Sequence, residues 1–313
     1  MLDDGIESKQ SRETESTIHT SVLLHEVIET LSIEADDLVI DATLGGGGHA
    51  REIILRLEND GVYIGIDADQ GALDRFAKVC PETKAQVLLV RENFRNIAKV
   101  LETTGYHSIT KALFDLGLSS DQLDVSHRGF SFLREEPLQM TLAEESSPGS
   151  VTAYDVVNEW TENQLQMIIA GYGEESWAKR IAQRIVEKRA EAPIATTTQL
   201  AQLISEAIPK RFHKRGHHPA TKTFQAIRIA VNDELSALSE GLEGAWQALV
   251  PQGRMVVISF HSLEDRIVKR FFHEQVATGM ARLLMKKPLT PQAEELHDNP
   301  RSRSAKLRAI EKN

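Results

Sequence analysis

The chain has 313 residues, 41% of them hydrophobic and 26% charged, as expected for a globular protein of one large domain or two ordinary ones. No apolar run approaches the roughly 20 residues of a membrane span, and the polar, acidic N-terminus carries no signal sequence, so we expect a cytoplasmic protein. The single cysteine, Cys80, excludes an internal disulfide and a multi-cysteine metal site. A net charge of −10 argues against nucleic-acid binding unless the basic residues cluster.

The first half of the chain alternates between short apolar runs and amphipathic segments. After a tail over residues 1–18 that we expect to be disordered, the pattern predicts a helix within His19–Leu31. The predicted strands are then Leu38–Asp41, Val62–Asp67, Ala85–Val90 and Ile109–Asp115, with helices His49–Leu57, Gly71–Val79 and Phe94–Leu101 between them. The alternation predicts an α/β fold with a parallel sheet, helices on both faces and a ligand beyond the carboxyl ends of the strands.

The second half begins with helices alone. They are predicted at Val151–Asn158, Glu162–Ala170, Ser176–Arg189 and Thr198–Ile208. We therefore expect an inserted helical domain over 123–215, between the two parts of the sheet domain, 19–122 and 216–313.

The remaining pattern predicts a long helix, a strand, a further helix and a final pair of strands. The long helix runs from Pro219 past Trp246, with a break near Gly241 or Gly244. The other predicted elements are a strand Gly253–Phe260, a helix Ser262–His273 capped by Ser262 with Asp265, and a hairpin or edge strands within Arg282–Leu289 and Ala305–Glu311.

Four consecutive glycines, Gly45–Gly48, lie between the first predicted strand and the next helix. Glycine lets the backbone approach a ligand and adopt positive φ, and a helix start offers unpaired N–H groups. Because Asp67 falls twenty residues after Gly47, the loop fits the loose pattern of a dinucleotide site, and an NAD-type cofactor is one alternative. We expect His49, directly behind the glycines, to act through its backbone N–H rather than through its ring.

Three acidic residues, Asp41, Asp67 and Asp115, each end a predicted strand and are expected to line one crevice. Asp67 suits a ribose diol. Asp41 and Asp115 would repel a pyrophosphate but attract the sulfonium and ammonium groups of S-adenosyl-L-methionine. The alternative is that each aspartate caps a turn, but three of them beside a glycine loop favour S-adenosylmethionine. Phe94, after the third strand, is placed either to flank an adenine or to pack in the core.

The segment Asp115–Leu123 leaves the fourth strand near the expected position of the cofactor methyl group. An exocyclic amine is a poor nucleophile because its lone pair is delocalised into the ring, and a carboxylate that accepts its N–H helps to localise that pair. Asp115 is therefore a candidate catalytic residue, or it only orients the cofactor. The Pro-Pro-aromatic sequence that often follows such an acid is missing. Gly129–Phe132 offers two phenylalanines that either stack on a base or pack in the core.

Basic residues cluster in the second half of this acidic chain. One group contains Lys210, Arg211, His213, Lys214, Arg215, His217 and His218, and another contains Arg266, Lys269, Arg270, Arg282, Lys286, Lys287, Arg301, Arg303, Lys306 and Arg308. A charge run is usually a solvated face. Beside a site for a nucleoside cofactor, the better interpretation is that these residues form a positively charged entrance that binds the phosphate backbone of a nucleic acid.

With these segments assembled, the chain resembles the RsmH (MraW) family of bacterial ribosomal small-subunit RNA methyltransferases. The matching strings are His19–Leu24, Asp41–His49, Asp115–Leu123, Arg128–Phe132, Tyr172–Glu175, His218–Ala226, Val231–Leu235, Ile258–Arg266 and Arg301–Arg308. The resemblance implies S-adenosylmethionine-dependent methylation of the exocyclic N4 of a cytidine in the decoding centre of 16S rRNA. It also implies a Rossmann-like class I methyltransferase core with an inserted all-α domain, and the small ribosomal subunit as partner.

Carried over by position, the family's cofactor contacts fall on Gly47, Gly48, His49, Asp67, Phe94, Asp115 and Gln122. The resemblance assigns no catalytic residue. The cysteine-bearing stretch of some members is absent, so we expect no metal. The oligomeric state stays open, with a homodimer as one option.

One departure concerns Pro137–Ala143. The family usually has Pro-Leu-Asp-Met-Arg-Met-Asp here, whereas this chain has Pro-Leu-Gln-Met-Thr-Leu-Ala, without the two aspartates and the arginine. One alternative is therefore a cofactor- and rRNA-binding protein with weak or no methyl transfer. Another is an amino-methyltransferase acting on a different nucleic acid.

Overall fold

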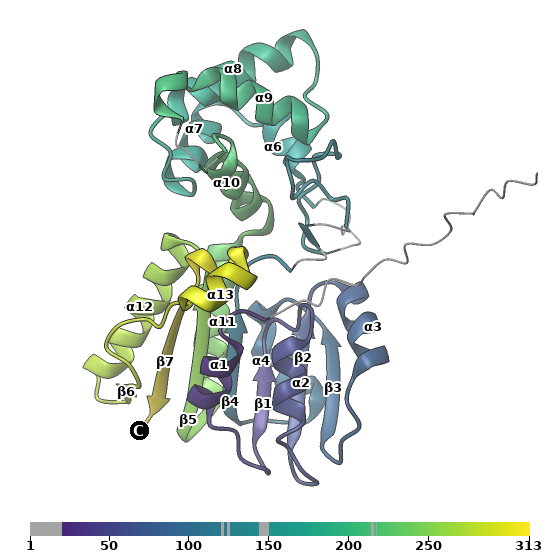
Figure 1. Ribbon diagram of the computed structural model, residues 1–313, viewed down its shortest axis with the longest axis vertical. Coiled ribbons are helices and arrows are strands. Elements are labelled where there is room, and N and C mark those ends of the chain that lie inside the picture. The colour runs from purple at the N-terminus through teal and green to yellow at the C-terminus, as the bar shows by residue number, and fades with distance from the viewer. Residues whose placement is uncertain (1–20, 120–121, 124–125, 144–149, 214–215, 217) are drawn as a thin grey trace, which may run out of the picture.

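The computed structural model describes residues 21–119, 122–123, 126–143, 150–213, 216 and 218–313 (Figure 1). The predicted tail 1–18 and three members of the first basic group, Lys214, Arg215 and His217, lie outside these residues. In the described part of the chain, no helix is both long and apolar enough to cross a membrane.

A seven-stranded sheet forms the base of the molecule (Figure 1). Its strands are β1 (Leu38–Asp41), β2 (Val62–Asp67), β3 (Gln86–Arg91), β4 (Ile109–Asp115), β5 (Leu249–Ser259), β6 (Ala281–Leu283) and β7 (Lys306–Lys312). The order is β3-β2-β1-β4-β5-β7-β6, and only the pairings of β7 are antiparallel. The predicted Rossmann-like α/β class is confirmed.

Helices cover both faces of the sheet. The helices on one face are α1 (Leu24–Leu31), α2 (Gly48–Ile54) and α3 (Gln70–Val79), and on the other α4 (Ile97–Thr104), α11 (Glu234–Ala248) and α12 (Ser262–Ala277). Successive residues of a strand point to opposite faces of the sheet. Leu113 of β4 packs in the hydrophobic core beneath α1, α2 and α3, and Phe114 packs in the core beneath α4, α11 and α12. Burying such a side chain contributes about 1.5–3 kcal/mol, so both layers hold the strand ends in place.

A separate group of helices lies above the carboxyl ends of the strands (Figure 1). This helical module contains α6 (Ala153–Glu159), α7 (Glu162–Gly171), α8 (Ala178–Glu191), α9 (Thr197–Ala207), the 3-10 turn η2 (Lys210–Phe212) and α10 (Thr221–Asn232). Its apolar core draws on residues from Phe130 to Ile227, so α10 packs with the module. The limits 123–215 drawn from the sequence stay a prediction.

The long helical pattern after Pro219 breaks at a different residue from the one predicted. The chain turns at Asp233, whose φ of 48° is left-handed, between α10 and α11. Gly241 lies inside α11, where a Cβ would stand 2.8 Å from the Phe94 ring. This glycine therefore serves close packing, and the prediction of a break there, or at Gly244, was wrong.

The cap of α12 also differs from the prediction. His261 is the N-cap and forms a capping box with Glu264, not Ser262 with Asp265. Asp265 instead accepts hydrogen bonds from Lys306 (3.0 Å) and Arg308 (2.6 Å) at the start of β7.

The last two strands pair antiparallel, but they do not form a simple hairpin. Between β6 and β7 lie α13 (Ala293–Asp298) and the 3-10 turn η3 (Pro300–Ser304). The edge-strand alternative is confirmed for β6, whereas β7 lies inside the sheet.

Asp233→Val should lower the free energy of unfolding, because a β-branched residue at φ 48° costs roughly 1–2 kcal/mol. Asp233→Asn is the matched control, since asparagine tolerates this conformation. Urea titration followed by circular dichroism measures both. Equal midpoints for the two variants would contradict the assignment of the break.

Candidate active site

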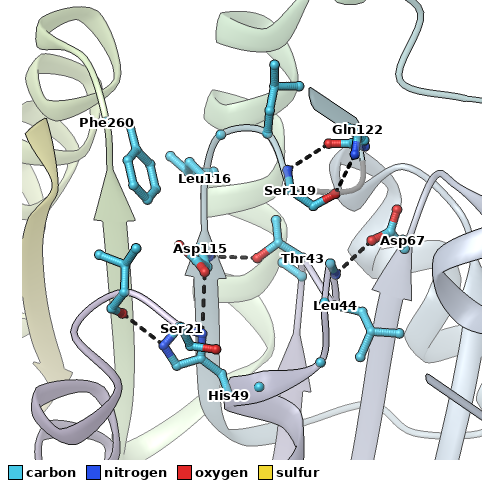
Figure 2. Close-up of a pocket in the computed structure, with 18 of the residues that line it drawn as sticks. Ser21, Thr43, Leu44, His49, Asp67, Asp115, Leu116, Ser119, Gln122 and Phe260 are labelled. Carbon is cyan, nitrogen blue, oxygen red and sulfur yellow. Dashed lines mark hydrogen bonds and ion pairs between the residues drawn. The ribbon is translucent and has the colours of Figure 1, made fainter. Parts of the chain in front are cut away.

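A cavity of about 420 Å³ opens at the carboxyl ends of the central strands (Figure 2). All seven residues carried over from the resemblance line it: Gly47, Gly48, His49, Asp67, Phe94, Asp115 and Gln122. That they bind cofactor stays a prediction. The size falls within the range of small-molecule sites.

The glycine loop forms the floor of the cavity and packs too closely for side chains. Gly47 has a φ of 76°, and a Cβ on it would overlap the Phe76 ring of α3. A Cβ on Gly48 would overlap the Ser21 hydroxyl. Phe76 lies on α3 and Ser21 in the N-terminal segment. The loop is therefore packed between these two parts of the chain, and its backbone is exposed to the cavity.

Asp67 at the end of β2 fixes the edge of this loop. Its carboxylate accepts hydrogen bonds from the backbone N–H of Gly45 and of Asp69, both at 2.9 Å. Burial raises the pKa of Asp67, and the two backbone hydrogen bonds oppose that rise. Each oxygen keeps a further lone pair with which it can accept a ribose hydroxyl.

Asp115 at the end of β4 forms an ion pair with the ring of His49, at 3.4 Å between Oδ2 and Nδ1 (Figure 2). The other ring nitrogen, Nε2, lies 3.1 Å from the Val22 carbonyl oxygen. A carbonyl only accepts, so Nε2 carries a hydrogen, and a favourable contact with the carboxylate requires one on Nδ1 as well. The His49 ring is thus engaged at both nitrogens, contrary to the expectation that only its backbone would matter.

The surroundings of His49 act on its pKa in opposite directions. Burial lowers the pKa, but the hydrogen bond and charge of Asp115, with smaller contributions from Asp41 and the Val22 carbonyl, raise it above the ordinary 6.5. Glu295 of α13 is a further acidic group whose charge interacts with His49.

The second oxygen of Asp115 is the unusual atom in this site. Oδ1 is buried and, among the described residues, has no hydrogen-bond partner. The residue is otherwise well held, because its backbone N–H donates to the Thr43 hydroxyl at 2.6 Å. A buried carboxylate oxygen without a donor is costly, and the Asp115 side chain as a whole is partly exposed and lines the cavity.

Asp41 does not line the cavity, so the prediction that three acids share one crevice was wrong. The sheet register explains this: Asp41 lies level with Leu113 and Gly65, two residues below Asp115 and Asp67. It is buried, accepts a hydrogen bond from the Tyr63 hydroxyl at 2.8 Å, and burial raises its pKa to about 6.

Phe94 and Gln122 frame other parts of the cavity. Phe94 lines it and also packs edge-on against Phe114, with ring centroids 5.9 Å apart, so its position fits both alternatives. Gln122 is fixed by Ser119, whose backbone N–H donates to Gln122 Oε1 at 2.9 Å. Phe130 is buried in the core of the helical module, so for this ring the structure favours core packing over stacking on a base.

The sequence predictions missed several parts of the cavity wall. They are Ser21 and Val22, Leu142, Phe260, and Asp298–Arg301. Most of them lie within or directly beside strings that matched the resemblance, which is the signal that could have identified them.

The altered segment 137–143 lies between the helical module and the cavity. Leu142 lines the cavity, its backbone N–H donates to Asn232 Oδ1 at 2.8 Å, and Asn232 Nδ2 donates to the Met140 carbonyl at 2.7 Å. Arg128 donates to the Leu142 carbonyl at 2.7 Å. The segment is therefore held through its backbone, without the charges that the family usually has there.

Glu234, His261 and Glu264 place side-chain atoms of the kind that bind metal ions within 4.8 Å of one another. The sequence analysis predicts no metal. Arg228 forms two hydrogen bonds of 2.8 Å with the Glu234 carboxylate. The Glu264 carboxylate is used by the α12 cap, where it accepts the Phe260 N–H at 2.8 Å. The group is an ion-paired cluster that joins α10, α11 and α12.

Acidic groups dominate the charge around the cavity. Among the described residues that line it are four carboxylates, Asp67, Glu92, Asp115 and Asp298, against two basic side chains, Arg301 and His49. A pyrophosphate would be repelled here, whereas a sulfonium and an ammonium would be attracted. The glycine loop, the Asp67 carboxylate and Asp115, whose Oδ1 has no donor among the described residues, together fit S-adenosylmethionine.

Comparison with known proteins decides the family. The model of the MraW methylase family matches residues 16–313. The chain belongs to the MraW methylase family. Two relatives of this methylase are the "Ribosomal RNA small subunit methyltransferase H" proteins of Clostridioides difficile strain 630 and Heliobacterium mobile. They are 44% and 46% identical to it, over 94% of this chain and 98% of each relative.

Among solved structures, this methylase is similar to an rRNA methylase from Streptococcus thermophilus, with a TM-score of 0.43, 11% identity and coverage of 95% and 99% of the two chains. The family identifies the chain as a class I methyltransferase, and S-adenosyl-L-methionine is its cofactor.

Gly47→Ala should weaken the binding of S-adenosylhomocysteine about tenfold, because alanine is strained at φ 76° by roughly 1–2 kcal/mol and its Cβ overlaps Phe76. Gly171→Ala is the control, since it meets nothing within 4 Å. Isothermal titration calorimetry measures both, and full affinity in Gly47→Ala would refute this account of the loop.

The pKa of the His49 ring, followed by NMR, should lie above 6.5 in the wild type and fall below 6.5 in Asp115→Asn, because burial alone disfavours the imidazolium. The pair then stabilises the fold fully below pH 6.5 and loses that contribution as the pH rises through the folded-state pKa. An unchanged titration in the variant would show that Asp115 does not hold the proton on His49.

Proposed function

We propose that this methylase transfers a methyl group to the exocyclic N4 of a cytidine in the decoding centre of 16S rRNA. The observation that carries the proposal is Asp115, a partly exposed carboxylate that lines the cavity and whose Oδ1 has no hydrogen-bond donor among the described residues. The two relatives named above act on the RNA of the small ribosomal subunit, according to their names. The small subunit is accordingly the proposed partner, and the cytoplasm the compartment.

S-Adenosylmethionine supplies an electrophilic methyl group on a sulfonium when it is bound. In the proposed arrangement Asp67 accepts the ribose hydroxyls, Phe94 flanks the adenine, and the backbone of Gly47, Gly48 and His49 contacts the cofactor. Gln122, fixed by Ser119, completes the cofactor wall. Each of these residues lines the cavity, which supports the assignment.

Asp115 has the proposed catalytic role. An N4 amine donates one N–H to Oδ1, which localises the nitrogen lone pair and holds the nitrogen in one orientation. His49 contacts Oδ2, which restricts rotation of the carboxylate, and Asp115 lines the cavity in which the amine is proposed to lie. Cytosine N4 has the required donor, whereas a ring carbon or a ribose 2′-hydroxyl would not use the carboxylate in this way.

Incubation with methyl-labelled S-adenosylmethionine and small ribosomal subunits that lack base methylation tests the proposal. We expect label on a single cytidine, located by nuclease mapping and identified as N4-methylated by mass spectrometry. Subunits that already carry the methyl group are the control and should accept none. Label on another base, or on another class of nucleic acid only, would overturn the proposed specificity.

The same labelling experiment also tests whether the altered segment 137–143 permits methyl transfer. Cofactor binding and subunit binding without transfer would favour the binding-protein alternative, and Gln139→Asp with Ala143→Asp would then be expected to restore turnover. With the segment held by Asn232 and Arg128 through its backbone, we expect the wild type to be active and this double variant to change turnover by less than about threefold.

A further inference from the structure

The cavity has two ends, which the sheet order separates. Asp67 and Phe94 follow β2 and β3, on one side of the central strands β1 and β4. Phe260 after β5 and residues Asp298–Arg301 before β7 line the other end. If Asp67 holds the cofactor ribose, the acceptor reaches Asp115 from this second end.

The η3 turn forms the outer wall at the second end. It follows α13, which Figure 1 shows at the upper end of the sheet, toward the helical module. α13 is fastened to the N-terminal segment, because the Leu23 N–H donates to Glu295 Oε1 at 2.8 Å. The wall therefore rests on the same segment whose Val22 carbonyl orients His49.

The turn itself is rigidly built. Ser302 is fully buried, and its hydroxyl donates to the Asn299 carbonyl at 2.7 Å. Ala305 is also buried and closes the turn through a 2.8 Å bond from its N–H to the Ser302 carbonyl. Arg301 and Arg303, on either side of Ser302, are exposed. Two guanidinium groups thus project from one short, anchored turn.

Three other basic residues near the C-terminus are held in ion pairs. Arg282 is paired with Glu311 at 2.6 Å, and both Lys306 and Arg308 are paired with Asp265. For Arg303, the described part of the chain contains no ion pair within 4.0 Å. Arg301 lines the cavity itself.

We propose that Arg301 and Arg303 bind the phosphate groups that flank the target nucleotide, so that its base lies at Asp115. Guanidinium groups bind phosphate oxygens in bidentate geometry. Asp298, the acidic neighbour at this end, would repel a phosphate placed over α13, which favours contact from the η3 side. The inference rests on the proposed RNA substrate, and it adds the residues that position that substrate.

The test compares wild type with Arg301→Ala/Arg303→Ala for equilibrium binding to unmethylated small ribosomal subunits at several salt concentrations. We expect about tenfold weaker binding at low salt, and a slope of log affinity against log salt that is smaller by about 1 to 2. S-Adenosylhomocysteine affinity, measured by calorimetry, should stay within about twofold, because the turn lies opposite the ribose end. Arg301→Lys/Arg303→Lys should keep the wild-type slope, since the charges remain.

Arg51→Ala is the matched control, since Arg51 is an exposed arginine on α2 that does not line the cavity. It should bind subunits as the wild type does. If the double variant fails to fold, as judged by circular dichroism, Arg303→Ala alone carries the test with an expected slope change of about 1.

Wild-type affinity and slope in the arginine variants would overturn the inference, as would an equal loss in Arg51→Ala. A parallel loss of S-adenosylhomocysteine binding would also overturn it, because the turn would then be structural. Binding is measured without methyl transfer, so a wild type that shows the arginine-dependent slope but labels no cytidine would refute the proposed function and support this inference.

Discussion

The ion pair between His49 and Asp115 is the interaction on which the site depends. The Val22 carbonyl fixes one nitrogen of the ring, and the ring in turn contacts one oxygen of the carboxylate, while Oδ1 has no donor among the described residues. The cost of burying the His49 ring is offset only while the pair is intact. Asp115 is thereby held in one orientation in the wall of the cavity.

The surrounding fold sets where that acceptor lies. The parallel register places Asp67 and Asp115 at one level, and β1 ends lower, so that the glycine loop can cross between them. Two distant parts of the chain then close the cavity: Leu142, which Asn232 of the helical module holds, and the η3 turn before β7. The insertion and the C-terminal segment thus complete a site whose floor comes entirely from the first half of the chain.

Much of this could be predicted from the sequence, because the deciding signals are local. Strand and helix periodicity located β1 to β4 to within a residue, and the glycines with Asp67 and Asp115 indicated the cavity at the carboxyl ends of the strands. Two of the errors arose where tertiary context decides. The depth of Asp41 depends on how far β1 extends relative to its neighbours. The break at Asp233 was assigned to Gly241 or Gly244, although both lie inside α11 and Gly241 packs against Phe94. The His49 ring and the η3 wall depend on contacts between distant segments, which periodicity does not report.

The central claim is that Asp115 acts on the acceptor amine through an oxygen that His49 orients. The most direct measurement is the single-turnover rate of methyl transfer to small subunits by Asp115→Asn at saturating cofactor, together with its affinity for S-adenosylhomocysteine. We expect a rate about 100-fold lower, with affinity within about threefold of the wild type. An unchanged rate, or a loss of affinity that accounts for the whole effect, would contradict it.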